Sequence, residues 1–72
     1  MTMVMMKKHY HTYQHEDRTA EVWKTTKGEW ATRYYDKQGG KASVWIEDIV
    51  HKGKSEHWAE DAAENWVLRV NS

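Results

Sequence analysis

Three of the five histidines lie close together near the start of the chain, at His9, His11 and His15. His9 and His11 would share one side of an extended strand, whereas His11 and His15 would share one side of a helix. Either spacing could hold Zn²⁺ or Ni²⁺, since imidazole is a common ligand of both ions. The chain has no cysteine, it has no HExxH motif, and the pattern shows no rigid element with further ligands. We therefore interpret the histidines as part of a polar arm, and predict no metal site and no cofactor.

Acidic side chains are the next candidates for chemistry. The acidic pairs at 47–48 and 60–61 are neighbours in sequence, and neighbouring side chains on a strand or a helix point apart. Neither pair therefore predicts an acid–base dyad. Glu56, Glu60 and Glu64 repeat every four residues and would form one acidic ridge along a helix. Two interpretations of this ridge stay open: a solvated helix face, or an acidic surface that binds a basic partner.

Nucleophiles and phosphate-binding loops give no signal. None of the serines lies in a G-x-S-x-G setting, and Ser55 is placed to cap a helix. The sequence contains neither a P-loop nor a G-x-G-x-x-G motif, and Gly39-Gly40 is typical of a hairpin loop. The prediction is that the protein is not an enzyme.

Aromatic residues are the strongest signal, with five tryptophans and four tyrosines in 72 residues. Alternation along the expected strands places four side chains together on the sheet face that one helix leaves uncovered. We call this surface the open face and define it by Trp23, Arg33, Tyr35 and Trp45. A bulge in the third expected strand would change this assignment and move Trp45 inside.

Three interpretations of the open face compete. The N-terminal arm could cover it with Tyr10 and Tyr13. A second copy of the chain or another protein could bind it, because exposed apolar patches often mark interfaces. Single-stranded nucleic acid could stack on its rings, with Lys24, Arg33 and Lys41 nearby.

The elements that must carry these residues follow from the hydrophobic pattern. Alternating segments predict strands at 18–25, 29–36 and 42–50, and a 3.6-residue period predicts a helix at 56–70. The expected fold class is α+β, a three-stranded antiparallel meander with one C-terminal helix packed on one face (β-β-β-α). We assign residues 1–17 to a flexible N-terminal arm and residues 18–72 to a single domain.

Composition limits the function further. Lys plus Arg equals Asp plus Glu at 11 each, which argues against binding of a polyanion by the whole surface. The segment 18–54 carries eight basic and five acidic residues, whereas 55–72 carries one and four. No apolar run approaches the roughly 20 residues of a membrane span, and the first residues do not follow the order of a signal peptide. We expect a cytoplasmic protein with no membrane partner.

The segment GKSEHWAEDAA, residues 53–63, resembles the start of the last helix in double-stranded-RNA-binding domains, near G-x-S-K-K-x-A-K-x-x-A. Its glycine, serine and alanines keep the spacing of that family. The resemblance covers about half of the chain and implies three strands followed by a helix. Glu56, His57 and Glu60 stand where the family has lysines that grip phosphate, so the resemblance does not imply RNA binding.

A second resemblance covers the body of the chain. The strings TAEVWK, GEW and SEHWAEDAAENW look like small uncharacterised proteins of tailed bacteriophages, especially cyanophages. This resemblance implies a viral protein that acts in a host cytoplasm, and it implies no activity.

These observations together predict a small, non-enzymatic protein-interaction module. It would bind a host or viral protein, or form a homodimer, through the open face or the acidic ridge. The alternative function is binding of single-stranded nucleic acid through the same aromatic and basic sheet face.

Overall fold

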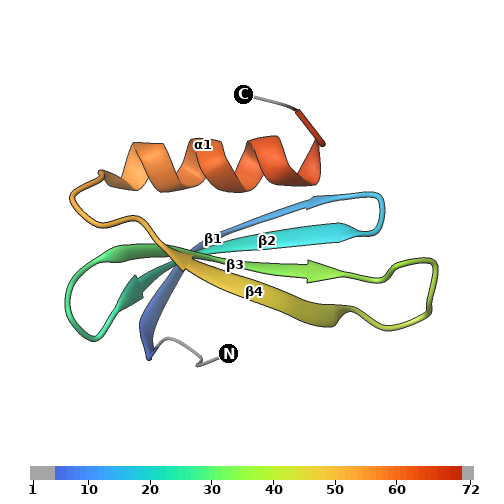
Figure 1. The fold of residues 1–72 in the computed structure, drawn as a ribbon, viewed down its shortest axis with the longest axis horizontal. Coiled ribbons are helices and arrows are strands. Elements are labelled where there is room, and N and C mark those ends of the chain that lie inside the picture. Colours follow the sequence, from blue (N-terminus) through green and yellow to red (C-terminus); the bar gives the residue numbers. More distant parts are fainter. Residues whose placement is uncertain (1–4, 71–72) are drawn as a thin grey trace.

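Figure 1 shows the computed structural model of the chain, which describes residues 5–70. Its fold is α+β, with an antiparallel sheet and one C-terminal helix, as the sequence predicts. The sheet has four strands in the order β1-β2-β3-β4. The elements in chain order are β1 (Met6–His15), β2 (Arg18–Thr25), β3 (Trp30–Asp36), β4 (Val44–Val50) and α1 (Glu56–Val67).

The prediction of three strands is wrong, because Met6–His15 form a fourth strand at the edge of the sheet. This segment belongs to the region assigned to a flexible arm, of which residues 1–4 lie outside the described part. Two register shifts, between Met6 and Lys8 and between His9 and His11, interrupt the pairing of β1 with β2. Such bulges break the alternation of side chains that reveals a strand in a sequence. The strand is also mostly exposed, so its polar residues show no buried face.

Short connections join the strands, which is why neighbours in sequence are neighbours in the sheet. Gly28, in the turn between β2 and β3, has a φ of 81°, a conformation that favours glycine. The turn between β1 and β2 uses Glu16 at a φ of 53°. That position carries no glycine or asparagine, so the sequence gives no signal for this hairpin.

Both ends of α1 are capped. The Ser55 hydroxyl accepts a hydrogen bond from the backbone N–H of Trp58, as expected for an N-cap. At the other end Arg69 takes a φ of 59°, and the N–H groups of Arg69 and Val70 donate to the carbonyls of Trp66 and Asn65. This is the Schellman arrangement. It ends the helix at Val67, three residues before the predicted end.

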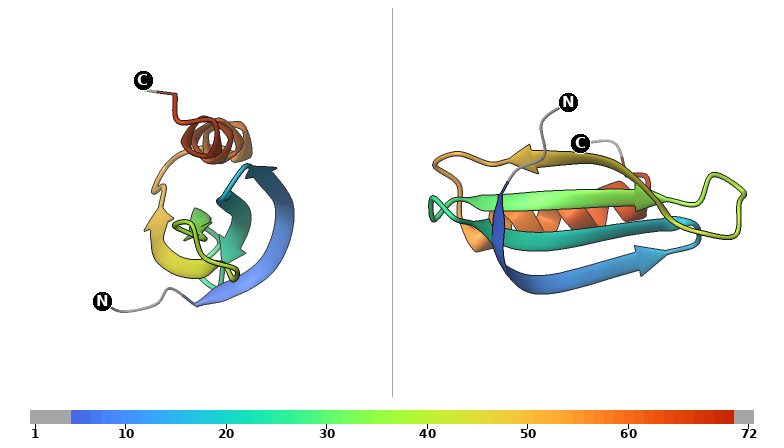
Figure 2. Two further views of the ribbon diagram at one scale, coloured as in Figure 1. Left: turned by 90° about the vertical axis from the view of Figure 1, so that its right-hand side faces the viewer. Right: turned by 90° about the horizontal axis from the view of Figure 1, so that it is seen from below.

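The core lies between α1 and one face of the sheet (Figure 1, Figure 2). Small residues of the helix allow the close approach of the two layers, and the aromatic rings of Tyr13, Trp30 and Trp66 pack around them. The buried core residues are Ala20, Val22, Tyr34, Ala59, Ala63 and Val67.

The helix lies over β1, β2 and β3 and leaves β4 at the side. Trp58 lies outside the core: it is 50% exposed, with the Lys54 ammonium 4.4 Å from the centre of its ring. Trp66 does pack inward, with its ring centroid 4.6 Å from that of Tyr34. Seen from below, the other face of the sheet carries no helix (Figure 2).

Candidate binding surface on the open sheet face

Strand pairing brings the residues of the open face into register. Arg33 on β3 lies between Glu21 on β2 and Asp48 on β4. One pair further along β3, Tyr35 lies opposite Trp45. Directly opposed residues of antiparallel strands point to the same side of the sheet, so these side chains share one surface.

A bulge in β4 decides which of its side chains belong to this surface. Tyr34 pairs with Glu47, whereas Tyr35 pairs with Trp45, so Ile46 has no partner of its own. Ile46 packs against the core, and the bulge places Trp45 and Asp48 on the same face although they are three residues apart. A bulge in this strand was expected to move Trp45 inside, but the bulge in β4 leaves Trp45 opposite Tyr35 on the open face.

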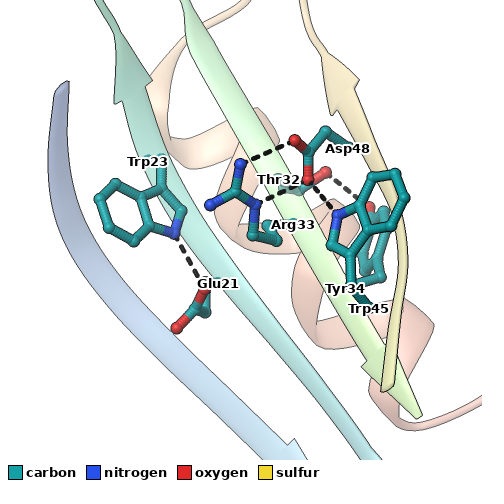
Figure 3. Close-up of polar contacts among 7 residues, drawn as sticks. All are labelled: Glu21, Trp23, Thr32, Arg33, Tyr34, Trp45 and Asp48. Atoms are coloured by element: carbon teal, nitrogen blue, oxygen red, sulfur yellow. Dashed lines mark hydrogen bonds and ion pairs between the residues drawn. The ribbon is translucent and has the colours of Figure 1, made fainter. Parts of the chain in front are cut away.

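An ion pair occupies the centre of the surface. Arg33 Nε lies 2.8 Å from Asp48 Oδ1, and Arg33 Nη2 lies 2.8 Å from Asp48 Oδ2, so the guanidinium grips the carboxylate with two parallel hydrogen bonds (Figure 3). Only 13% of the Arg33 side chain and 2% of the Asp48 side chain are exposed. The hydrogen bond to Asp48 raises the pKa of Arg33 above its ordinary value, against the opposing effect of burial.

Two tryptophans flank this ion pair (Figure 3). The Trp45 Nε1–H donates to Asp48 Oδ1 at 2.9 Å, and the Trp23 Nε1–H donates to Glu21 Oε1 at 3.0 Å. The Arg33 guanidinium carbon lies 5.8 Å from the centre of the Trp23 ring. Both indoles are half-buried, and they limit access of water to the ion pair.

Tyr35 completes the predicted set and is also half-buried. Burial raises the pKa of its phenol above the ordinary value, and the nearby Glu21 carboxylate raises it further. The structure therefore brings Trp23, Arg33, Tyr35 and Trp45 together on one side of the sheet, as the alternation of the strands predicts.

The acidic ridge lies on α1, and its three carboxylates have different surroundings. Glu56 and Glu60 turn towards His11 on β1, at 3.1 Å and 3.0 Å from its Nε2, and Glu64 stays exposed. The ridge is on the helix layer, on the opposite side of the sheet from the open face (Figure 2). Two of its three carboxylates thus have a partner within the chain.

The N-terminal segment does not cover the open face with its tyrosines. Tyr13 packs against the core beneath α1, and the Tyr10 ring lies 4.8 Å from that of Trp30, which also packs on the core. On the open-face side, the ring centroid of His9 lies 5.0 Å from that of Trp23, and Thr12 pairs with Glu21. The interpretation of Tyr10 and Tyr13 as a cover is therefore wrong.

Sequence reasoning missed Asp48 and Glu21, the two carboxylates that hold the rings and the arginine of this surface. Strict alternation places Asp48 on the side of Ile46, and only the bulge moves it to the other side. Glu21 is in phase with Trp23, so the alternation of β2 did carry a signal for it.

A second buried polar network lies on the helix side of the sheet. The Thr32 hydroxyl donates to Tyr34 Oη at 2.7 Å and lies 3.0 Å from His51 Nε2. Burial lowers the pKa of His51 below its ordinary value and raises that of Tyr34 above its ordinary value. Both shifts favour the neutral forms of these side chains.

Compared with protein-family models, with curated proteins and with solved structures, the chain matches none of them. The resemblances to double-stranded-RNA-binding domains and to phage proteins thus stay predictions. No helix within residues 5–70 is long and apolar enough to cross a membrane.

Proposed function

We propose that the protein is a small, non-enzymatic interaction module that binds a protein partner through its open face. The observation that supports this most is the cluster of two tryptophans and a tyrosine around the ion pair of Arg33 and Asp48, on a sheet face without a helix. Tryptophan, tyrosine and arginine are the residues that most often dominate the energy of protein interfaces.

The polar groups of the surface are already paired within the chain. The indole N–H groups of Trp23 and Trp45 donate to Glu21 and Asp48, so a partner can cover the rings without leaving these donors unsatisfied. Because the side chains are held in place before binding, association costs little ordering of the surface. A flat apolar side chain or a second sheet would complement such a surface.

Binding of a protein partner through the acidic ridge has less support than binding through the open face. Glu56 and Glu60 already contact His11, which leaves Glu64 as the exposed member of the ridge. The open face is therefore the better candidate for the main interface.

The test compares variants of the two faces. Trp45→Thr removes a ring from the open face and keeps a residue that suits a strand, whereas Trp58→Gln removes the half-exposed tryptophan of α1 and serves as the matched control. Sedimentation of the purified protein measures homodimer formation, and affinity capture followed by titration measures binding to another protein. We expect Trp45→Thr to lose binding by about tenfold or more, which is ~1.4 kcal/mol, and Trp58→Gln to keep it.

Two outcomes would contradict the proposal. One is a wild-type protein that stays monomeric and captures no partner. The other is a partner that Trp45→Thr binds as tightly as the wild type does. Thermal melts of both variants establish that the fold persists.

Binding of single-stranded nucleic acid is the second candidate function, and a surface other than the open face supports it. Lys24 lies on the helix side, with its ammonium 4.6 Å from the centre of the Trp30 ring, so it does not support binding at the open face. A hollow of about 480 Å³ beside Tyr10 is instead lined by several lysines. These are Lys7, Lys8, Lys24 and Lys27, and none of them forms an ion pair with a carboxylate of the described chain.

Salt dependence tests this second candidate. Phosphate binding releases counterions, so the affinity for a labelled oligonucleotide must fall steeply as salt rises. Lys24→Glu should weaken binding, and Lys41→Glu, in the loop between β3 and β4, is the control. An affinity that neither salt nor Lys24→Glu changes would exclude this site. The proposed setting for either function is the cytoplasm of a phage host, which rests on the phage resemblance alone.

A further inference from the structure

Three side chains that can each bind a metal ion converge where β1 meets the first turns of α1. His11 Nε2 lies 3.1 Å from Glu56 Oε2 and 3.0 Å from Glu60 Oε2, and the three ligand atoms lie within 4.8 Å of one another. The histidine and Glu56 are 45 residues apart along the chain. The fold itself therefore brings them together.

Hydrogen bonding within the cluster leaves an excess of negative charge. Nε2 of an imidazole carries at most one hydrogen, yet two carboxylate oxygens lie within hydrogen-bond distance of His11 Nε2. Even a protonated His11 balances only one of the two carboxylate charges. No lysine or arginine among residues 5–70 forms an ion pair with Glu56 or Glu60.

We propose that His11, Glu56 and Glu60 bind one divalent transition-metal ion, with Zn²⁺ as the best fit. A doubly charged ion and a neutral imidazole balance both carboxylates. Zn²⁺ binds nitrogen and carboxylate oxygen at about 2.0–2.2 Å, which places neighbouring ligand atoms of a tetrahedral site roughly 3.3–3.6 Å apart around the ion. The distances of His11 Nε2 to the two carboxylate oxygens, 3.1 Å and 3.0 Å, are shorter than this range by a few tenths of an ångström, so a bound ion would move the three side chains slightly apart.

The type and number of ligands define the site further. Imidazole nitrogen favours zinc, nickel and copper, whereas Mg²⁺ and Ca²⁺ prefer oxygen ligands only. The exposed fractions of the three side chains are 41%, 41% and 27%, so water can complete the coordination. A bound ion would join β1 to α1, and binding to the folded state alone must raise the melting temperature.

Calorimetric titration of the tag-free, metal-free protein with Zn²⁺ tests the site. Glu60→Gln removes a charged ligand with little change of shape, and Glu64→Gln is the matched control one turn further along the same helix. His15→Gln controls for adventitious binding by the other histidines of β1. The wild type and both controls should bind one ion, whereas Glu60→Gln and His11→Gln should lose affinity by about tenfold or more, equivalent to ~1.4 kcal/mol.

Thermal melts add an independent measurement. Zn²⁺ should raise the melting temperature of the wild type and of Glu64→Gln, and it should not raise that of Glu60→Gln. If Glu60→Gln is unfolded in EDTA, nuclear magnetic resonance of the wild type provides the test instead. Addition of Zn²⁺ must shift the imidazole resonances of His11 and leave those of His57 in place. Three results would overturn the proposal. These are equal Zn²⁺ affinities of Glu60→Gln and Glu64→Gln, a wild type that does not bind one Zn²⁺ ion, and His11 resonances that Zn²⁺ does not shift.

Discussion

Arg33 and Asp48 face each other across β3 and β4 and form two parallel hydrogen bonds of 2.8 Å on a sheet face that no helix covers. An ion pair that is exposed to solvent contributes little to stability, because water and salt screen its charges. Here the indoles of Trp23 and Trp45 flank the pair, and Trp45 also donates to the carboxylate (Figure 3). The ion pair and its aromatic neighbours thus form one structural unit on the open face.

Asp48→Ala should destabilise the protein strongly. It leaves the mostly buried Arg33 guanidinium without its carboxylate, and loss of one partner of a buried ion pair costs about 3–5 kcal/mol. Urea unfolding measures the change. Asp61→Ala is the control, because Asp61 is exposed on α1 and should change the free energy of unfolding by no more than about 0.5 kcal/mol. Similar midpoints for the two variants would show that the ion pair is not a structural element.

Deletion of residues 1–15 should abolish the cooperative thermal transition. It removes β1, exposes the edge of β2, and takes away Tyr13, which packs against the core. A domain of this size has only about 5–15 kcal/mol of stability to lose. Near-ultraviolet circular dichroism against temperature provides the measurement. A truncated protein that melts like the full chain would mean that the three remaining strands and α1 suffice for the fold.

Trp66→Ala should cost about 3 kcal/mol, at the low end of the range for a tryptophan because Trp66 is only partly buried. Its ring packs on Tyr34, and the Arg18 guanidinium carbon lies 4.5 Å from the ring centre. Trp58→Ala, on the outer side of the same helix, should cost about 0.5 kcal/mol or less. Chemical denaturation measures the free energy of unfolding of both variants. A larger decrease for Trp58→Ala than for Trp66→Ala would show that α1 packs against the sheet with its other side.

Acid should destabilise the protein through His51. Burial lowers the pKa of His51 in the folded state below the ordinary value of about 6.5. Above about pH 6.5 the side chain is neutral in both states. As the pH falls below this value, the unfolded chain binds a proton that the folded chain does not bind, so the free energy of unfolding decreases until the folded pKa is reached.

His51→Gln should reduce this loss of stability, and glutamine can still hydrogen-bond to Thr32. The measurement is the free energy of unfolding of both proteins from about pH 7 to about pH 5. His57→Gln, at an exposed position of α1, is the matched control. Identical pH dependence for wild type and His51→Gln would show that protonation of His51 is not resisted by the fold.

The regular parts of this chain could be predicted from its sequence. The strand at 18–25 begins and ends where the pattern places it, because the buried Ala20 and Val22 alternate with half-buried residues. The helix start was equally clear, since Ser55 is a strong N-cap residue. Trp23, Arg33 and Tyr35 share one side because β2 and β3 keep strict alternation, and Trp45 on β4 joins them through its pairing with Tyr35.

The irregular parts could not be predicted, and each has a local cause. Two bulges concealed β1, and one bulge in β4 concealed the place of Asp48 beside Trp45. The helix end depends on Arg69 at a positive φ, where glycine is the usual signal. The convergence of His11 with Glu60 depends on long-range packing of β1 beneath α1, which no local pattern contains.

Site-specific photo-cross-linking tests the proposed function of the open face most directly. A photoreactive phenylalanine derivative would replace either Tyr35, on the open face, or Trp58, on the outer side of α1. After irradiation in extract of the producing cells, mass spectrometry identifies the adducts, whether with a second copy or with another protein. We predict one discrete protein adduct from position 35 and none from position 58. An adduct from position 58 alone, or no adduct from either position, would contradict the assignment of the open face as the binding surface.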